Sequence, residues 1–136
     1  MTQESEGKKA FYKAEYRAKN NYLWLRTNGV LTVESLIELI TDSVKLGIEN
    51  NCSRALVDHR YLMTEFDHQI LKGLPAYLEK NGLRRKSRVA TVLPLDEKSA
   101  ECVSIVINEA IAMGRTEKTF TDPEQALIWL LQSDED

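Results

Sequence analysis

The sequence is poor in the residues from which disulfide frameworks, metal sites and catalytic centres are built. Its 136 residues include only two cysteines, two histidines and three prolines. Cys52 and Cys102 do not form a CxxC pair, and two cysteines are too few for a disulfide framework. The six glycines are scattered, so there is no nucleophile elbow, phosphate loop or dinucleotide-binding turn. We therefore expect no catalytic residue, no cofactor and no enzyme activity.

Long apolar runs and a strong net charge are also missing. The longest apolar stretches, such as 103–107 with its internal serine, are far shorter than a bilayer span. Residues 1–9 are polar and lack the apolar segment of a signal peptide. A net charge of −3 gives no general attraction to nucleic acid. We expect a cytoplasmic protein with reduced thiols, without a membrane span and without a nucleic-acid partner.

The composition that is present suits one folded domain. The apolar fraction is 43% and the charged fraction 29%, which supplies a core and an ordinary polar surface. A chain of this length has too little surface for two separate cores. We predict a flexible lead-in over residues 1–9, one domain over 10–132 and an acidic tail over 133–136.

Apolar strands alternate with amphipathic helices along the chain. The predicted order is strand 11–17, strand 22–27, helix 33–49, strand 55–57, a helix capped by Thr64, strand 89–93, a helix after Asp96, strand 117–121 and a helix capped by Asp122. Strands joined through helices pair in parallel, whereas the first two strands form an antiparallel hairpin. The predicted fold is mixed α/β, with a largely parallel sheet, an N-terminal hairpin and four helices.

The apolar periodicity also predicts which faces are buried. In strand 22–27, Leu23 and Leu25 lie on one face, which we expect to meet the core. The second helix is expected to bury Phe66, Ile70, Leu74, Tyr77 and Leu78. The third is expected to bury Val103, Val106, Ile107, Ala110 and Ile111.

Four segments carry a family resemblance. They are Leu31–Glu34 after Gly29, the strand Arg54–Asp58, the strand Arg88–Val92, and Phe120–Asp122 leading into Ala126–Leu130. With this order of elements, residues 10–132 resemble the SpoIIAA-like family of the STAS (anti-sigma-factor antagonist) fold group. The resemblance implies a small bacterial cytoplasmic protein that acts as a non-enzymatic regulatory or protein-interaction module, with a protein partner or a second copy of itself.

The resemblance also implies a candidate phosphoacceptor. Well-understood relatives are phosphorylated on a serine in an Asp-Ser-Ser-Gly-like turn, where a strand leads into a helix. The matching turn here is Tyr61–Phe66, so only Thr64 could accept the phosphate. The Ser-Gly pair of the family is absent, and the alternative interpretation is that Thr64 is a structural N-cap.

Two surface features are candidates for partner binding. Trp24 lies in a tyrosine-rich hairpin, and aromatic residues are enriched at binding hot spots; packing of the outer strand is the alternative. Arg84, Arg85 and Lys86 form a basic run that suits an acidic partner or anionic lipid head groups. The alternative for this run is a solvated loop.

Two further hypotheses concern ligands. The dipeptides Asp58–His59 and Asp67–His68 contain metal-binding residue types, but their spacing matches no metal motif. We therefore predict no metal site and treat these histidines as surface or hydrogen-bonding residues. Some members of the resembled family share a fold likeness with CRAL-TRIO lipid-binding domains. The alternative function is therefore binding or carriage of a small apolar or lipid-like ligand, with helix 103–111 lining the site.

Overall fold

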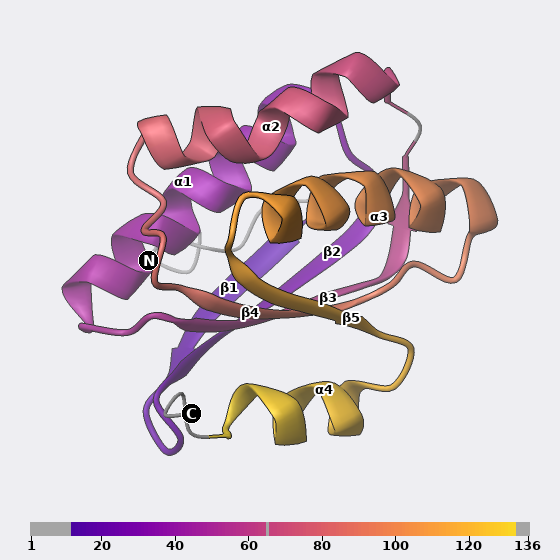
Figure 1. Cartoon of the computed structure of the whole chain (residues 1–136). Helices are drawn as coiled ribbons and strands as arrows, with labels where there is room; N and C mark the ends of the chain where they lie inside the picture. Colours follow the sequence, from indigo (N-terminus) through magenta and orange to yellow (C-terminus); the bar gives the residue numbers. More distant parts are fainter. Residues whose placement is uncertain (1–11, 65, 133–136) are drawn as a thin grey trace, which may run out of the picture.

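The computed structural model describes residues 12–64 and 66–132. In this part of the chain a five-stranded sheet lies between two helical layers (Figure 1), with α1, α2 and α3 on one face and α4 on the other. The elements in order are β1 (Tyr12–Arg17), β2 (Tyr22–Val30), α1 (Val33–Glu49), β3 (Arg54–Met63), α2 (His68–Lys80), β4 (Arg88–Val92), α3 (Glu97–Ala112), β5 (Thr116–Phe120) and α4 (Pro123–Leu130).

The strands of the sheet follow the order of the sequence. β1 pairs with β2 antiparallel, and β2, β3, β4 and β5 pair in parallel with their neighbours. The hairpin turns at Asn21, which has a positive φ of 54°, a conformation that asparagine tolerates. The predicted fold class and element order are confirmed.

Side-chain caps set the beginnings of the helices. Thr32, Asp67, Asp96 and Asp122 each accept a hydrogen bond from a backbone N–H in the first turn of the helix that follows. These bonds satisfy donors that would otherwise have no intrahelical partner. α3 ends before Gly114, whose φ is +92°, a conformation that glycine adopts without a Cβ penalty.

The prediction that Thr64 caps α2 is wrong. The helix begins at His68, and its N-cap is Asp67, whose side chain accepts from the Gln69 N–H. The Thr64 N–H instead donates to Ser99 Oγ at 2.8 Å, and its hydroxyl donates to the Leu31 carbonyl at 3.1 Å. These longer-range partners compete successfully with local capping, so Thr64 joins the end of β3 to the start of α3.

The buried faces of α2 and α3 differ in part from the prediction. α2 buries Leu71, Leu74, Pro75 and Leu78. Ile70 and Tyr77, which were expected in the core, are 49% and 47% exposed, and Ile111 of α3 is 45% exposed. Phe66 precedes the helix. The prediction is wrong for Ile70, Tyr77 and Ile111 because they lie at the edges of the buried stripes, which in α2 centre on Leu71, Leu74, Pro75 and Leu78.

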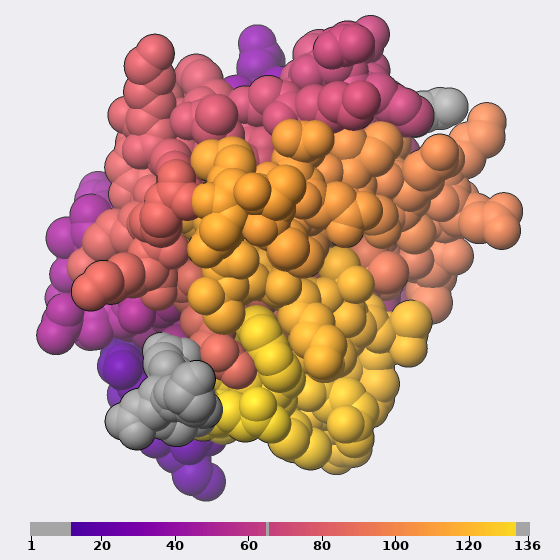
Figure 2. All heavy atoms as spheres, viewed as in Figure 1, coloured from indigo at the N-terminus to yellow at the C-terminus, as the bar shows by residue number. Residues whose placement is uncertain are grey.

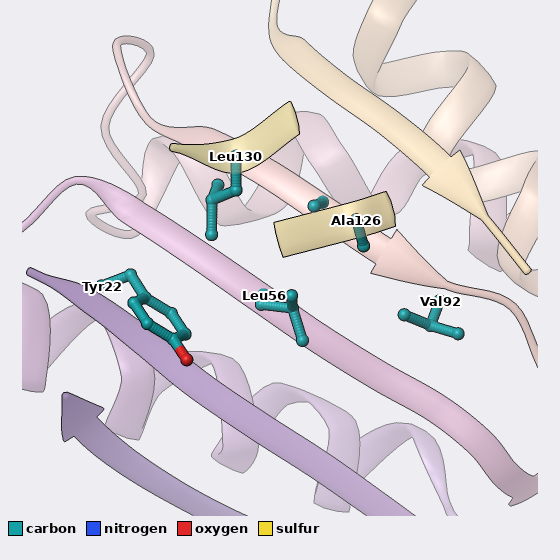
Figure 3. Packing of buried hydrophobic residues seen from close by; sticks show 6 residues of the cluster. Tyr22, Leu56, Val92, Ala126 and Leu130 are labelled. Carbon is teal, nitrogen blue, oxygen red and sulfur yellow. The ribbon is translucent and has the colours of Figure 1, made fainter. Parts of the chain in front are cut away.

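Both faces of the sheet carry a core. Leu23 and Leu25 pack with Leu39 of α1, as predicted. On the opposite face, side chains from β2, β3 and β4 pack under α4, as Figure 3 shows. This cluster consists of Tyr22, Leu56, Ala90, Val92, Ala126 and Leu130. The single helix α4 packs on β3, β4 and β5.

Candidate functional site

A cavity of about 170 Å³ lies between the sheet and the layer formed by α1, α2 and α3. In Figure 2 the side chains of α3, in orange, close against α2 and cover this side of the sheet. The lining is mainly apolar. It includes Leu23, Leu25, Ala55, Val57 and Val89 from the sheet and Ile40, Val44, Pro75, Leu78, Val106, Ile107 and Ala110 from the helices.

The cavity reaches the surface beside the loop that joins α2 to β4. Ser53, Gly82 and Arg84 line this end, and all three residues are exposed. Arg84 belongs to the predicted basic run, so the structure places one residue of that run at the mouth of the cavity. A small molecule could therefore enter between this loop and the sheet without crossing the core.

His59 is the main polar group of the interior. It lies on β3, is 8% exposed, and lines both the large cavity and a neighbouring one of about 70 Å³. Its Nδ1 shares a hydrogen bond of 2.7 Å with Oγ1 of the fully buried Thr27 on β2. Burial lowers the pKa of His59 to about 4, although the nearby Asp58 carboxylate acts in the opposite direction. The imidazole is therefore neutral at pH 7.

The smaller cavity continues the apolar interior past His59. It shares His59, Val106 and Ile107 with the large cavity. Its remaining lining comes from Leu31, Leu36, Leu62, Thr64, Phe66, Leu71, Leu74, Cys102 and Val103. Thr64, the candidate phosphoacceptor, and Cys102 thus lie in the wall of an apolar space.

An ion-pair network closes one end of the large cavity. The fully buried side chain of Arg115 donates to Glu117 through Nε at 2.8 Å and to Glu79 through Nη1 at 2.9 Å. Glu79 also pairs with Arg85 at 2.9 Å. Burial raises the pKa of Glu117 despite its bond to Arg115. Two guanidinium groups and two carboxylates balance each other within this network, and Arg54 and Arg84 also line the cavity.

A second surface lies on the α4 side of the sheet, around Trp24. The Trp24 ring is half-buried, and three cations surround it at the following distances from its centroid: Arg17 at 4.4 Å, Arg26 at 5.0 Å and Lys13 at 6.0 Å. Exposed Tyr61 lies next to Arg26 and Arg60. We call Lys13, Arg17, Trp24, Arg26, Arg60 and Tyr61 the Trp24 surface.

Asp58 organises the cations of this surface. Its carboxylate is buried and accepts from Arg60 Nη2 at 2.9 Å and from Arg26 Nη2 at 3.2 Å. Burial acts to raise the pKa of Asp58, but the hydrogen bonds from Arg60 and the charge of Arg26 hold it below its ordinary value. The carboxylate therefore stays ionised and fixes both guanidinium groups beside the aromatic rings.

The structure divides the predicted site residues among separate places. Trp24 lies on the α4 side, whereas Arg84 lies at the mouth of the cavity on the other side of the sheet. Arg85 is held by Glu79 and by the Met113 carbonyl. Lys86 is exposed. No structural observation tests whether Thr64 accepts a phosphate; its hydroxyl is bonded to Leu31.

Metal-ligating residues do not gather in the described part of the chain, where no group of three or more His, Cys, Asp or Glu side chains forms a candidate metal site. Asp58 and His59 belong to opposite faces of β3, and His68 is exposed at the start of α2. Within residues 12–64 and 66–132, no helix is both long and apolar enough to cross a bilayer.

Sequence reasoning missed the Thr27–His59 pair, because β3 was predicted to cover only 55–57. The strand runs to Met63, and alternation along it places Ala55, Val57 and His59 on one face. If the predicted strand had been extended through the polar residues 58–60, its alternation would have placed His59 on the same face as Ala55 and Val57. No sequence pattern pointed to Arg115, because its partners Glu79 and Glu117 lie on separate elements, α2 and β5.

The chain matches no model of a known protein family and no curated protein. Among solved structures it is similar to an uncharacterised protein of the DUF3478 family with a SpoIIAA-like fold from Shewanella loihica PV-4. The two share 23% identity, with a TM-score of 0.54 over 88% of this chain and 91% of the other. The likeness confirms the predicted SpoIIAA-like fold.

Proposed function

We propose that this chain is a non-enzymatic binding module that encloses a small, mostly apolar ligand between its sheet and α1, α2 and α3. The cavity of about 170 Å³ is the observation that supports this proposal. Protein interiors are normally packed to the density of organic crystals. An apolar cavity of about 150 Å³ is large enough to bind benzene.

The energetics of the cavity also favour a ligand. Apolar side chains that face a space without packed atoms lose contact free energy on that side. A ligand that fills it recovers part of this free energy as contacts with the lining. The exposed end at Ser53, Gly82 and Arg84 gives such a ligand a route inward.

A cavity-filling variant tests the proposal. Ala110 is 2% exposed and lines the cavity, so Ala110→Leu places a larger side chain in the space. Ala112→Leu, at an exposed position of the same helix, is the matched control. Benzene binding, followed by NMR shifts of the lining residues, should be lost in Ala110→Leu and kept in the control. Absence of benzene binding to the wild-type protein would count against the function.

A second candidate is a regulatory protein-interaction module of the STAS kind, for which the Trp24 surface is the supporting observation. Four basic side chains lie there beside two aromatic rings and pair with two carboxylates, Arg26 and Arg60 with Asp58, and Lys13 and Arg17 with Glu15. An acidic segment of a partner protein fits this excess of positive charge. Fluorescence titration with an acidic peptide tests it. The Trp24 signal should respond, and Arg17→Gln should weaken the binding.

A homodimer and phosphorylation of Thr64 stay predictions within this second candidate. Sedimentation equilibrium checks the first, and mapping of phosphosites after incubation with kinase-containing lysate and ATP checks the second. A monomer that is unmodified at Thr64 would remove both.

A further inference from the structure

We propose that the cavity selects a neutral molecule the size of phenol, with an apolar ring against the lining and one hydroxyl at His59 and Thr91. The inference rests on the proposed ligand-binding function and adds the chemical class of the ligand. It is carried by the hydrogen-bonding groups of the cavity and by the charges along its wall.

His59 has hydrogen-bonding capacity that the fold does not use. Nδ1 is engaged by Thr27 Oγ1 at 2.7 Å. Within residues 12–64 and 66–132, Nε2 has no hydrogen-bond partner, although the side chain lines both cavities. In a neutral imidazole one ring nitrogen donates and the other accepts. Whichever tautomer the Thr27 bond selects, Nε2 remains available to a hydroxyl, which can both donate and accept.

Thr91 supplies a second group on the same wall. It lies on β4 opposite Val57 of β3, within two residues of His59, is 2% exposed and lines the large cavity. Its hydroxyl has no hydrogen-bond partner in the described part of the chain. Buried polar groups are normally hydrogen-bonded. A ligand hydroxyl placed between His59 and Thr91 would satisfy both residues.

The wall of the cavity argues against an anionic ligand. Arg115 is the buried cation there; its Nε and Nη1 bind the carboxylates of Glu79 and Glu117 and the carbonyl of Arg84, and its Nη2 has no hydrogen-bond partner in the described part of the chain. Glu117 itself lines the cavity. A ligand carboxylate at His59 would meet an apolar lining and a neutral imidazole, whereas the other cations of the lining, Arg84 at the exposed mouth and Arg54 with its bond to the Gln132 carbonyl, are solvated or already engaged. Burial of an unpaired charge is far more costly than burial of a hydroxyl.

The volume limits the size of the ligand. The large cavity measures about 170 Å³, and a cavity of about 150 Å³ accommodates benzene. A single six-membered ring with one substituent is therefore the expected scale.

Binding of benzene, phenol and benzoate at pH 7.5, measured by calorimetry and by NMR shifts of lining residues, tests the inference. One net hydrogen bond of about 1 kcal/mol corresponds to roughly a fivefold to tenfold gain. We expect phenol to bind roughly five to ten times more tightly than benzene, and benzoate not to bind. His59→Leu should remove the preference for phenol while keeping benzene binding.

Thr91→Val is the second variant. It removes the hydroxyl with little change in side-chain volume, and it tests the inference even if His59→Leu does not fold. It should reduce the preference for phenol and leave benzene binding unchanged. Equal affinity for phenol and benzene in the wild-type protein overturns the inference and leaves the proposed function standing. Tighter binding of benzoate also overturns it. Failure of all the probes to bind instead removes the proposed function.

Discussion

Asp58 and His59 are consecutive residues of β3, and their side chains serve opposite faces of the sheet. Asp58 faces the α4 side, where it binds Arg26 and Arg60. His59 faces α1, α2 and α3, where it binds Thr27. This alternation allows two polar residues to stand in the middle of a ten-residue strand, because each finds a partner on its own side. The Trp24 surface and the cavity therefore lie on opposite faces of the sheet, and adjacent residues of β3 contribute to each.

The first prediction concerns His59 and acid stability. The unfolded imidazole takes up a proton near pH 6.5 and the folded one near pH 4. Between these values the unfolded state binds more protons, so stability is complete above about pH 6.5 and is lost as the pH falls towards 4. The loss is on the order of 3 kcal/mol from this group. Urea unfolding at intervals between pH 7 and pH 4 measures it.

The matched variants for this prediction are His59→Gln and His68→Gln. His59→Gln should flatten the pH dependence, whereas His68→Gln, at an exposed position, should leave it as in the wild-type protein. Glu117 has a raised pKa and contributes with the opposite sign, so the difference between the two variants isolates His59. Identical slopes in both variants would contradict the prediction.

The second prediction concerns the carboxylate that holds two arginines. Asp58→Asn removes a buried charge partner of Arg26 and Arg60, and we expect a loss of about 1–3 kcal/mol at pH 7, reduced by the partial exposure of both arginines. The pKa of Asp58 is lowered by folding, so its stabilisation is present above the unfolded pKa and disappears as the pH falls through the folded pKa. The wild type and the variant should therefore converge in strong acid.

Glu15→Gln is the control for Asp58→Asn. Glu15 pairs with Lys13 and Arg17 on the same side of the sheet, but its side chain is 38% exposed. Exposed pairs contribute little, so this change should stay within about 0.5 kcal/mol. Thermal unfolding of both variants measures their losses of stability. An equal loss in the two would contradict the larger contribution expected for Asp58.

The third prediction concerns the close contact between Gly47 of α1 and the backbone of Cys52, just before β3. A Cβ at Gly47 would lie 2.8 Å from the Cys52 carbonyl oxygen, and a Cβ at Gly73 would meet nothing within 4 Å. Gly47→Ala should therefore destabilise the fold by about 1–3 kcal/mol through overpacking. Gly73→Ala, at an exposed position of α2, should stabilise it by up to about 1 kcal/mol. Chemical denaturation gives both values, and a neutral Gly47→Ala would refute the close approach.

The fourth prediction distinguishes the true cap of α2 from the residue that was expected to cap it. Asp67→Ala should cost about 1 kcal/mol and accelerate hydrogen exchange at the Gln69 amide, because that amide donates to Asp67. Thr64→Val should cost a similar amount through loss of its bond to Leu31, but it should leave exchange at Gln69 unchanged. Faster exchange at Gln69 in Thr64→Val would restore Thr64 as the cap.

The order of elements was predictable because its signals are local. Thr32, Asp96 and Asp122 stand immediately before apolar-periodic segments, and a cap acts within one helical turn. Leu23 and Leu25 reveal their face through a period of two residues. Such patterns need no knowledge of which segments meet in space.

The candidate site was not predictable because it depends on segments far apart in the chain. Thr27 and His59 are 32 residues apart, and the cavity exists only where α1, α2 and α3 fail to fill the space over the sheet. The prediction that Thr64 caps α2 failed for the same reason, because its partners Leu31 and Ser99 lie more than 30 residues away in the chain. His59 and Arg60 lie beyond the end of the predicted strand, but they belong to β3, where His59 binds Thr27 and Arg60 binds Asp58.

The imperfect packing beneath α3 makes this protein sensitive to hydrostatic pressure. Unfolding eliminates packing voids such as those of the cavity of about 170 Å³, so compression favours the unfolded state by an amount that scales with the void volume. A molecule that occupies the cavity removes much of this void volume. Pressure therefore favours the unfolded state, and a ligand in the cavity opposes this effect. The midpoint pressure of unfolding should rise when a ligand occupies the cavity.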